Sequence, residues 1–127
     1  MSANAKVLLV DDSGLARRSM RAMLEDGGFD VVEAEDGMIA LEKYFVEKPD
    51  LVMLDLVMKG MYGLDVLAKL RELDPAARVV VVSADVQSSS QEMVQAAGAS
   101  GFINKPIDRA HLIQVVRNVL EGGTQWN

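Results

Sequence analysis

Short runs of apolar residues recur along the chain and are separated by stretches of mixed polarity. Three of these runs are continuous rather than alternating, at residues 7–10, 51–54 and 79–82. Strands that are covered on both faces, as in a parallel sheet, have this continuous character. Two shorter runs, Val31-Val32 and Phe102-Ile103, complete the series. The pattern therefore predicts five strands.

A stretch with helical spacing follows each predicted strand. After the first strand, Leu15, Met20, Met23 and Leu24 lie roughly on one face, and Gly27-Gly28 then ends the helix. The second and third helices start at Asp36-Gly37 and Gly63. The fourth is indicated by the capping-box spacings of Ser88 with Gln91 and Ser89 with Glu92, which precede Met93, Val94 and Ala97. The fifth is indicated by an apolar stripe that ends at Gly122-Gly123 and consists of Leu112, Val115, Val116, Val119 and Leu120.

This alternation of strands and helices, with short connections, predicts an α/β fold: a doubly wound five-stranded parallel sheet, (βα)5, with helices on both faces. Right-handed crossovers are nearly obligatory in such a sheet. We adopt the strand order 2-1-3-4-5 from known doubly wound folds, because the sequence alone does not determine it.

Composition and charge narrow the class of protein. The chain has 127 residues, and its 13 basic and 19 acidic residues give a formal net charge of −6. An acidic balance argues against direct nucleic-acid binding through phosphate contacts. Because there is no cysteine and one histidine, His111, disulfides, thiolate catalysis and Cys- or His-rich metal sites are excluded.

The same data predict one domain and its location. No apolar run approaches the length of a membrane span, and the start, MSANAK, has no apolar core of a secretory signal. We expect a cytoplasmic single domain over residues 1–127 without membrane insertion. Its core would cover about residues 5–121, and residues 122–127 would be a flexible tail or the start of a linker.

Polar residues stand where the predicted strands end. Asp11-Asp12 follow the first strand and Asp55 the third, while Ser83 and Asn104-Lys105-Pro106 follow the fourth and fifth. Ligands of open α/β sheets bind at the carboxyl edge where the strand order reverses, which is between strands one and three here. That cleft would therefore hold Asp11, Asp12 and Asp55.

Three carboxylates in one cleft repel one another unless a cation is present. Oxygen ligands without nitrogen or sulfur suit Mg²⁺, which favours sites shared with phosphate. Lys105 adds a positive charge and Ser83 a hydroxyl donor on the same rim. The set indicates transfer of a phosphoryl group onto a carboxylate, with an Asp as nucleophile.

Plainer interpretations exist for each residue alone. Asp11-Asp12 could cap the first helix, because Asp favours that position. Asp55 could be an ordinary loop acid, Ser83 the start of a turn, and Lys105 a solvated lysine. The cap interpretation is disfavoured because one helix cap needs only one acid. The loop interpretation is disfavoured because an Asp55 with no function would only add electrostatic repulsion opposite Asp11 and Asp12.

Taken together, these motifs resemble the receiver domains of bacterial two-component response regulators, the CheY-like family. The resemblance covers about residues 5–121 and is carried by the set rather than by any one motif. Its parts are Asp11-Asp12 after an apolar strand, Leu54-Asp55-Leu56-Val57-Met58 followed by Gly60 and Gly63, Val82-Ser83-Ala84, and Lys105-Pro106.

The resemblance implies a flavodoxin-like fold and a role for each matching residue. Asp55 would be the phosphoacceptor, and Asp11, Asp12, Asp55 and the main-chain carbonyl of Val57 would hold Mg²⁺, with Asp12 the more direct ligand. Lys105 would pair with the phosphoryl group, and the Lys105–Pro106 peptide bond would be cis. Ser83 would hydrogen-bond the phosphoryl group, and Phe102 would be the aromatic switch residue that follows Ser83 inward.

The resemblance also implies partners. A sensor histidine kinase or histidine phosphotransfer protein would donate the phosphoryl group, and a target protein would bind the face made by the fourth helix, fifth strand and fifth helix. A phosphorylation-linked dimer is a further expectation. Such a domain is not an enzyme in the usual sense, since it catalyses phosphoryl transfer only to, and hydrolysis only from, its own aspartate.

Two residues depart from the family pattern in the loop after Asp55. Lys59 stands where a proline is common and Tyr62 where an aspartate is common, which puts the kinetics and the choice of partner in question. Val57 and Asp85 would line the mouth of the site and tune the phosphoryl lifetime. Two alternative functions stay open: a phosphorylation-independent interaction receiver and a flavodoxin-like cofactor module, although neither a GxGxxG nor a GxxxxGK[ST] motif occurs.

Overall fold

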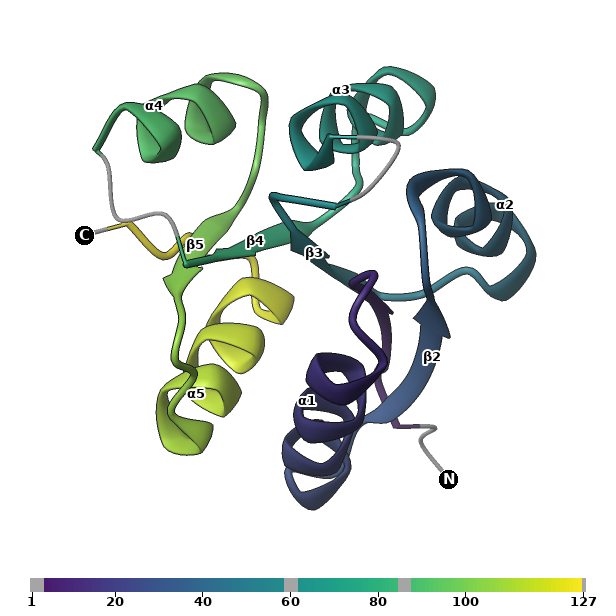
Figure 1. Ribbon diagram of the computed structural model, residues 1–127, viewed down its shortest axis with the longest axis vertical. Coiled ribbons are helices and arrows are strands. Elements are labelled where there is room, and N and C mark those ends of the chain that lie inside the picture. Colours follow the sequence, from purple (N-terminus) through teal and green to yellow (C-terminus); the bar gives the residue numbers. More distant parts are fainter. Residues whose placement is uncertain (1–3, 59–61, 85–87, 127) are drawn as a thin grey trace.

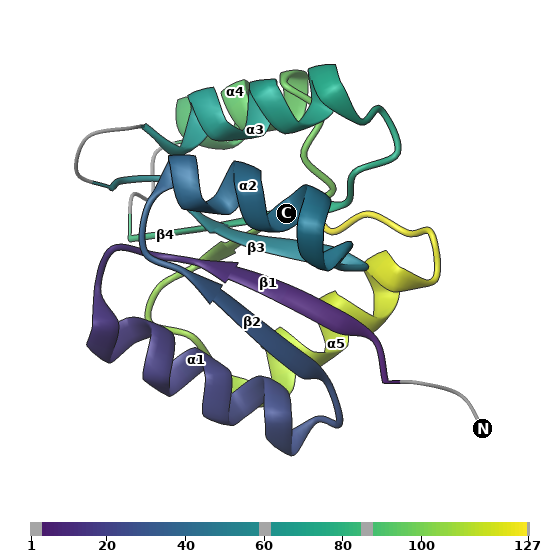
Figure 2. The same ribbon diagram turned by 90° about the vertical axis from the view of Figure 1, so that its right-hand side faces the viewer.

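The protein is a parallel sheet enclosed between two layers of helices, seen from two directions in Figures 1 and 2. The computed structural model describes residues 4–58, 62–84 and 88–126. The helices α2, α3 and α4 lie on one face of the sheet, and α1 and α5 lie on the other (Figure 2). The elements in chain order are β1 (Lys6–Val10), α1 (Gly14–Asp26), β2 (Asp30–Ala34), α2 (Gly37–Glu47), β3 (Leu51–Asp55), α3 (Gly63–Leu73), β4 (Val79–Ser83), α4 (Ser88–Ala96), β5 (Gly101–Asn104) and α5 (Arg109–Leu120).

All neighbouring strands of the sheet are parallel, in the order β2-β1-β3-β4-β5. The expected fold class and strand order are therefore confirmed. Strands β1 and β3 are neighbours in register, with Val10 opposite Leu54. The residues that follow this pair are Asp11 and Asp55, so the register brings these two acids to the same edge.

Each face of the sheet has its own hydrophobic core. One core, on the side of α2, α3 and α4, contains Leu54, Val81 and Phe102; the other, on the side of α1 and α5, contains Met53, Val80 and Ile103. Every residue of β3 and of β4 is buried, as the continuous apolar runs predicted.

The helices begin at the polar residues that the sequence offers. Asp36 caps α2 by accepting a hydrogen bond from Ile39 N–H, and Asp108 caps α5 in the same way from His111 N–H. The predicted starts at Asp36-Gly37 and Gly63 are confirmed. Helix α4 is present as predicted, but the side chains of Ser88 and Ser89, which carried its capping boxes, lie outside the described part of the chain.

The prediction for α1 is wrong at one position. Met20 and Leu24 are buried and Met23 is partly buried, but Leu15 is 75% exposed. In an α-helix, Leu15 has the phase of Arg18 and Ala22, which are also exposed. The residue that faces the core one turn before Met20 is Ala16.

The chain after residue 121, expected to be a flexible tail or the start of a linker, turns back toward the sheet. Gln125 forms a parallel β-bridge with Gly101 of the edge strand β5, so this residue lies beside the sheet. Among the helices that the structure describes, none is both long and apolar enough to cross a bilayer.

Candidate functional site

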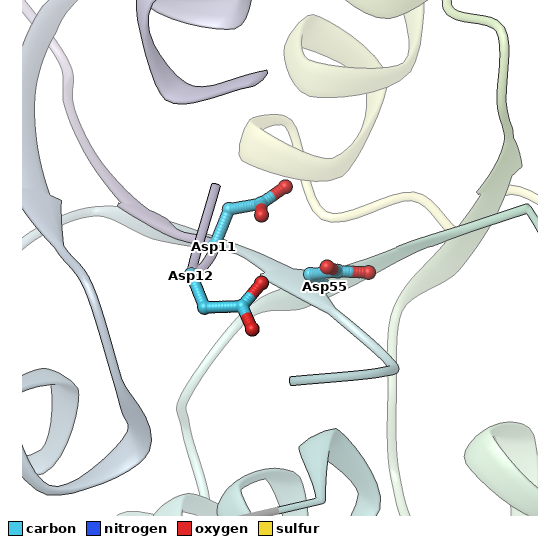
Figure 3. Close-up of side chains that lie close together, drawn as sticks. All are labelled: Asp11, Asp12 and Asp55. Carbon is cyan, nitrogen blue, oxygen red and sulfur yellow. The ribbon is translucent and has the colours of Figure 1, made fainter. Parts of the chain in front are cut away.

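The carboxyl ends of β1 and β3 bring three acidic side chains together. Asp11, Asp12 and Asp55 each offer a carboxylate oxygen within 4.8 Å of the others, and Figure 3 shows the cluster at this end of the sheet. Asp11 and Asp55 are buried, with 1% and 8% of their surface exposed, whereas Asp12 is exposed. The cluster therefore has two buried members and one that faces solvent.

Lys105 reaches this cluster from the end of β5. Its Nζ lies 3.3 Å from Oδ2 of Asp11 and 3.8 Å from Oδ2 of Asp55. The main-chain N–H of Lys105 donates to the carbonyl oxygen of Ser83 at 2.8 Å, which ties the ends of β4 and β5 together. The Lys105–Pro106 peptide bond is cis, as predicted.

The loop between β1 and α1 is held by hydrogen bonds around Asp11. Its Oδ1 accepts from Ser13 N–H at 2.9 Å, and Ser13, rather than either acid, is the N-cap of α1. The plainer interpretation of Asp11-Asp12 as a helix cap is therefore wrong. The side chain of Asp11 faces Lys105 with its other oxygen, and its carboxylate belongs to the cluster.

Arg17 is a residue of this region that the sequence analysis missed. Its guanidinium donates to the carbonyl oxygen of Asp11 at 2.6 Å and to Oε1 of Glu33 at 2.9 Å. Glu33 also pairs with Arg21, and these hydrogen bonds hold the pKa of its carboxyl below the usual value. Nothing in the sequence separates Arg17 from the exposed Arg18 beside it, because the distinction depends on which side of α1 faces β2.

The electrostatics of the cluster oppose ionisation of Asp55. Burial, and then the negative charge of Asp11, raise the pKa of Asp55 to about 6, against the opposing effects of Lys105 and the N–H of Val57. Three carboxylates thus gather at one place, and the Lys105 ammonium lies 3.3 Å and 3.8 Å from two of them, Asp11 and Asp55. A hard cation with oxygen ligands would relieve this repulsion, and carboxylates are the donors that Mg²⁺ prefers.

Of the other predicted site residues, Val57 contacts the cluster, while Ser83 and Phe102 lie on the neighbouring strands β4 and β5. The main-chain N–H of Val57 donates to Oδ1 of Asp55 at 3.4 Å, while its side chain is 61% exposed. Ser83 is buried at the end of β4, where it pairs with Asn104 of β5. Phe102 is buried in β5 opposite Val81, within the core on the side of α4.

The loop after Asp55 contains both departures from the family pattern. Lys59 and Gly60 lie outside the described residues, and so does Asp85. Tyr62 is 42% exposed and occupies the N-cap position of α3 without a side-chain capping hydrogen bond. An aspartate at that place would be a favoured cap.

Comparison with known proteins places the chain in one family. The chain matches the response regulator receiver domain family over residues 7–117. It is 36% identical to the chemotaxis protein CheY of Bacillus subtilis over 116 residues, which cover 91% of this chain and 97% of that protein. It is 38% identical to CheY of Listeria monocytogenes, over 87% of this chain and 94% of that protein.

Solved structures show the same similarity. A two-component response regulator of the LuxR family from Aurantimonas has a TM-score of 0.92 and 32% identity, covering 98% of this chain and 90% of that one. The CheY of Borrelia burgdorferi, solved in a CheX-CheY-BeF3-Mg+2 complex, has a TM-score of 0.87 and 35% identity, covering 91% of this chain and 88% of that one. On the matched family, the relatives and the shared fold, this chain belongs to the response regulator receiver domain family.

Proposed function

We propose that this protein is a response regulator receiver that accepts a phosphoryl group on Asp55 in a Mg²⁺-dependent reaction. The donor is a sensor histidine kinase or a histidine phosphotransfer protein. The observation that carries the proposal is the arrangement of Asp55 beside Asp11, Asp12 and Lys105, in a chain of this family. The described elements, from β1 to α5, act together as one receiver domain.

In the proposed reaction, a carboxylate oxygen of Asp55 forms a bond to phosphorus while the bond from phosphorus to the donor's leaving group breaks. The leaving group departs with the electrons of that bond, and the product is an acyl phosphate on Asp55. Lys105 pairs with the transferred group, since its ammonium already lies 3.8 Å from Asp55. Hydrolysis of the acyl phosphate regenerates the carboxylate of Asp55. The chain is therefore modified and restored at its own aspartate and does not act as an enzyme on other molecules.

The residues present suit Mg²⁺. Its proposed ligands are Asp11, Asp12, Asp55 and the main-chain carbonyl of Val57, with Asp12 the more direct ligand by resemblance to the family. When bound, Mg²⁺ supplies charge stabilisation for the phosphoryl oxygens. The support for this set is the all-oxygen cluster with two buried acids and one positive charge. The CheY of Borrelia burgdorferi, whose solved complex contains BeF3 and Mg+2, agrees with it.

The output follows from the strands that end at the site. Ser83 at the end of β4 bonds to the phosphoryl group, and Phe102, which pairs with β4 two residues earlier in the register, follows it. A target protein then binds the face formed by α4, β5 and α5, and phosphorylation can favour a dimer. The transition is a population shift, which requires that the partner bind the two states with different affinity.

The test is phosphorylation by a small-molecule donor. The protein is incubated with acetyl phosphate and Mg²⁺, and intact mass measures the addition of one phosphoryl group. We expect uptake in the wild type and no uptake in Asp55→Asn. Wild-type protein that has been treated with a chelator should take up the phosphoryl group only after Mg²⁺ is added back. Asp65→Asn, which changes an exposed acid on α3, is the matched control and should behave as the wild type.

Two results would contradict the proposal. Uptake by Asp55→Asn equal to that of the wild type would mean that another residue is the acceptor. No uptake, together with no binding of beryllofluoride in the presence of Mg²⁺, would favour the alternative of a phosphorylation-independent interaction receiver. A flavodoxin-like cofactor module would instead show a flavin absorbance spectrum, and the acidic cluster, which repels phosphate without a metal, speaks against it.

A further inference from the structure

The C-terminal segment Gly122–Trp126, which we call the strap, lies along the edge strand β5. Gln125 pairs with Gly101 in parallel orientation: its N–H donates to the carbonyl oxygen of Ser100 at 2.9 Å, and its carbonyl oxygen accepts from the N–H of Phe102 at 3.3 Å. These are the main-chain bonds that an added strand makes with the edge of a sheet. At Gly101 the strap therefore occupies the place that a sixth strand would take.

The start of the strap is attached to the end of α5. The side chain of Asn118 donates to the carbonyl oxygen of Thr124 at 3.1 Å, and the N–H of Gly123 donates to the carbonyl oxygen of Asn118 at 2.9 Å. Gly122 adopts a positive φ of 96°, which turns the chain back toward the sheet. The turn at Gly122 and both Asn118 bonds direct the chain onto β5.

The strap crosses from one helical layer to the other. Figure 2 shows it rising from α5, below the sheet, toward the layer of α2, α3 and α4, and Figure 1 shows its end beside β5 and near α4. There Trp126 is partly buried and packs against the core that contains Phe102, Val94 and Ala99. The strap thus runs from the end of α5, past the first residue of β5, to the core on the side of α4.

A glycine on β5 permits this close approach. A Cβ atom at Gly101 would lie 3.1 Å from Cβ of Gln125 and 3.2 Å from its carbonyl oxygen. Those distances are tighter than most Cβ contacts, so a larger residue at 101 would require Gln125 to shift by a few tenths of an ångström. Edge strands are ready templates for pairing with another chain, and covering the edge is one way to prevent such pairing.

The strap is joined to the functional site through Phe102. The residue shares a main-chain hydrogen bond with Gln125 and a core with Trp126, and its strand leads three residues later to Lys105, whose ammonium lies beside Asp11 and Asp55. A displacement of Phe102 would therefore alter two of the contacts that hold the strap, its hydrogen bond to Gln125 and the core against which Trp126 packs. If the contacts of the strap differ between the unmodified and the phosphorylated protein, docking of the strap favours the state in which those contacts are stronger.

Building on the proposed function, we propose that the strap is an autoinhibitory segment: it covers the start of the β5 edge, at Gly101, while Asp55 is unmodified, and phosphorylation of Asp55 favours its release. The partner admitted by release is a protein that adds an extended segment to β5, bonding to Ser100 and Phe102 as Gln125 does. By linkage, docking of the strap and modification of Asp55 oppose each other by the same factor.

Trp126 reports the position of the strap, because it is the sole tryptophan of the chain. Acrylamide quenching of its fluorescence is measured with Mg²⁺ alone and with Mg²⁺ plus beryllofluoride, while intact mass follows uptake from acetyl phosphate in parallel. We expect beryllofluoride to raise the quenching constant toward that of the urea-unfolded chain in the wild type and to leave it unchanged in Asp55→Asn. Phosphoryl uptake with an unchanged quenching constant would overturn the proposed release of the strap and leave the proposed function intact.

A variant of the full chain tests the reverse linkage, in which weaker docking of the strap should raise the affinity of the site for beryllofluoride. Gln125→Pro removes the N–H that donates to Ser100 and keeps Trp126 as the reporter. Its quenching constant should already be high without beryllofluoride, and its affinity for beryllofluoride, measured by fluorine NMR, should rise about fivefold. Thr124→Ala, which keeps the main-chain contacts, is the matched control.

The outcomes of the two experiments separate the two proposals. Equal affinity of Gln125→Pro and Thr124→Ala for beryllofluoride, with Trp126 exposed in the former, would show that the strap docks without coupling to the site, and would overturn the inference. A low quenching constant in Gln125→Pro would show that the bond to Ser100 does not hold the strap, which also overturns it. Absence of both phosphoryl uptake and beryllofluoride binding would overturn the proposed function, and the coupling with it.

Discussion

Asp55 is a carboxylate whose burial and whose neighbour Asp11 both oppose its ionisation. Its pKa of about 6 lies above the ordinary value of 3.8, although Lys105 and the N–H of Val57 pull it down. The folded protein without metal therefore holds the Asp55 proton more tightly than the unfolded chain does. The arrangement that suits a cation and a phosphoryl group is one that destabilises the metal-free fold near neutral pH.

The pH dependence of stability follows from the direction in which folding shifts the pKa of Asp55. Because the folded pKa is the higher one, the contribution of Asp55 is fully present below about pH 4 and is lost as the pH rises through about 6. We expect Asp55→Asn to raise the free energy of unfolding at pH 7.5 by up to about 3 kcal/mol, less what the lost ion pair with Lys105 contributed. Urea unfolding in a chelator, from pH 4 to 7.5, measures the difference between wild type and variant.

Asp65→Asn serves as the control for this prediction, because it removes an acid from an exposed position on α3. The difference between Asp55→Asn and wild type should shrink toward pH 4, whereas that of Asp65→Asn should stay small throughout. A wild type that is more stable than Asp55→Asn at pH 7.5 would contradict the proposed electrostatic cost.

Among the elements, the connection from β3 to α3 fixes where Asp55 stands. The N–H of Gly63 donates to the carbonyl oxygen of Leu56 at 2.9 Å, so the first residue of α3 rests on the chain just after Asp55. A Cβ atom at Gly63 would lie 2.7 Å from Cα of Leu56 and still nearer to the carbonyl oxygen of Asp55. Both neighbours are main chain and cannot move aside without shifting the strand or the helix.

Gly63→Ala should therefore destabilise the protein by about 1–3 kcal/mol, the usual cost of an overpacked position. Chemical denaturation measures it, with Gly14→Ala as the control at the start of another helix. At Gly14 the nearest atom to an added Cβ is the end of the Arg17 side chain, at 3.7 Å, which is ordinary contact. Equal stability of the two variants would mean that α3 does not rest on β3 as described.

For the whole molecule, the acidic cluster links metal binding to global stability. The cluster joins Asp11, which follows β1, to Asp55 at the end of β3, 44 positions away, and it forms only when the sheet is assembled. A ligand that binds only the folded state stabilises it by mass action. The unfolded chain separates these acids and gives Mg²⁺ no comparable site.

Mg²⁺ should therefore raise the unfolding free energy of the wild type by about 1.4 kcal/mol at a concentration ten times its dissociation constant. Asp12→Asn removes the exposed carboxylate of the cluster and should lose most of this gain. Thermal unfolding at constant ionic strength, with NaCl replacing MgCl₂ in the reference sample, measures the effect. An equal gain in Asp12→Asn and wild type would argue against the proposed ligand set.

Much of the fold could be predicted because its signals are local. The continuous apolar runs produced β3 and β4, the Asp36 cap opened α2, and the stripe from Leu112 to Val119 became the buried side of α5. Leu15 was predicted incorrectly because a hydrophobic side chain near the first turn of a helix can fall on either side of the apolar face. Its neighbour Ala16, a weaker hydrophobic signal, takes the inward position.

The succession of strands and helices, and the acidic and basic residues that follow the strands, could be predicted without coordinates, because periodicity and strand-end position are local properties of the chain. The distances that give those residues their chemistry came from the fold: Lys105 beside Asp11 and Asp55, Arg17 on the carbonyl of Asp11, and the burial that raises the pKa of Asp55. The position of residues 122–126 on β5 came from the fold as well. Burial and through-space charge depend on which distant segments the sheet brings together, and no local pattern encodes that.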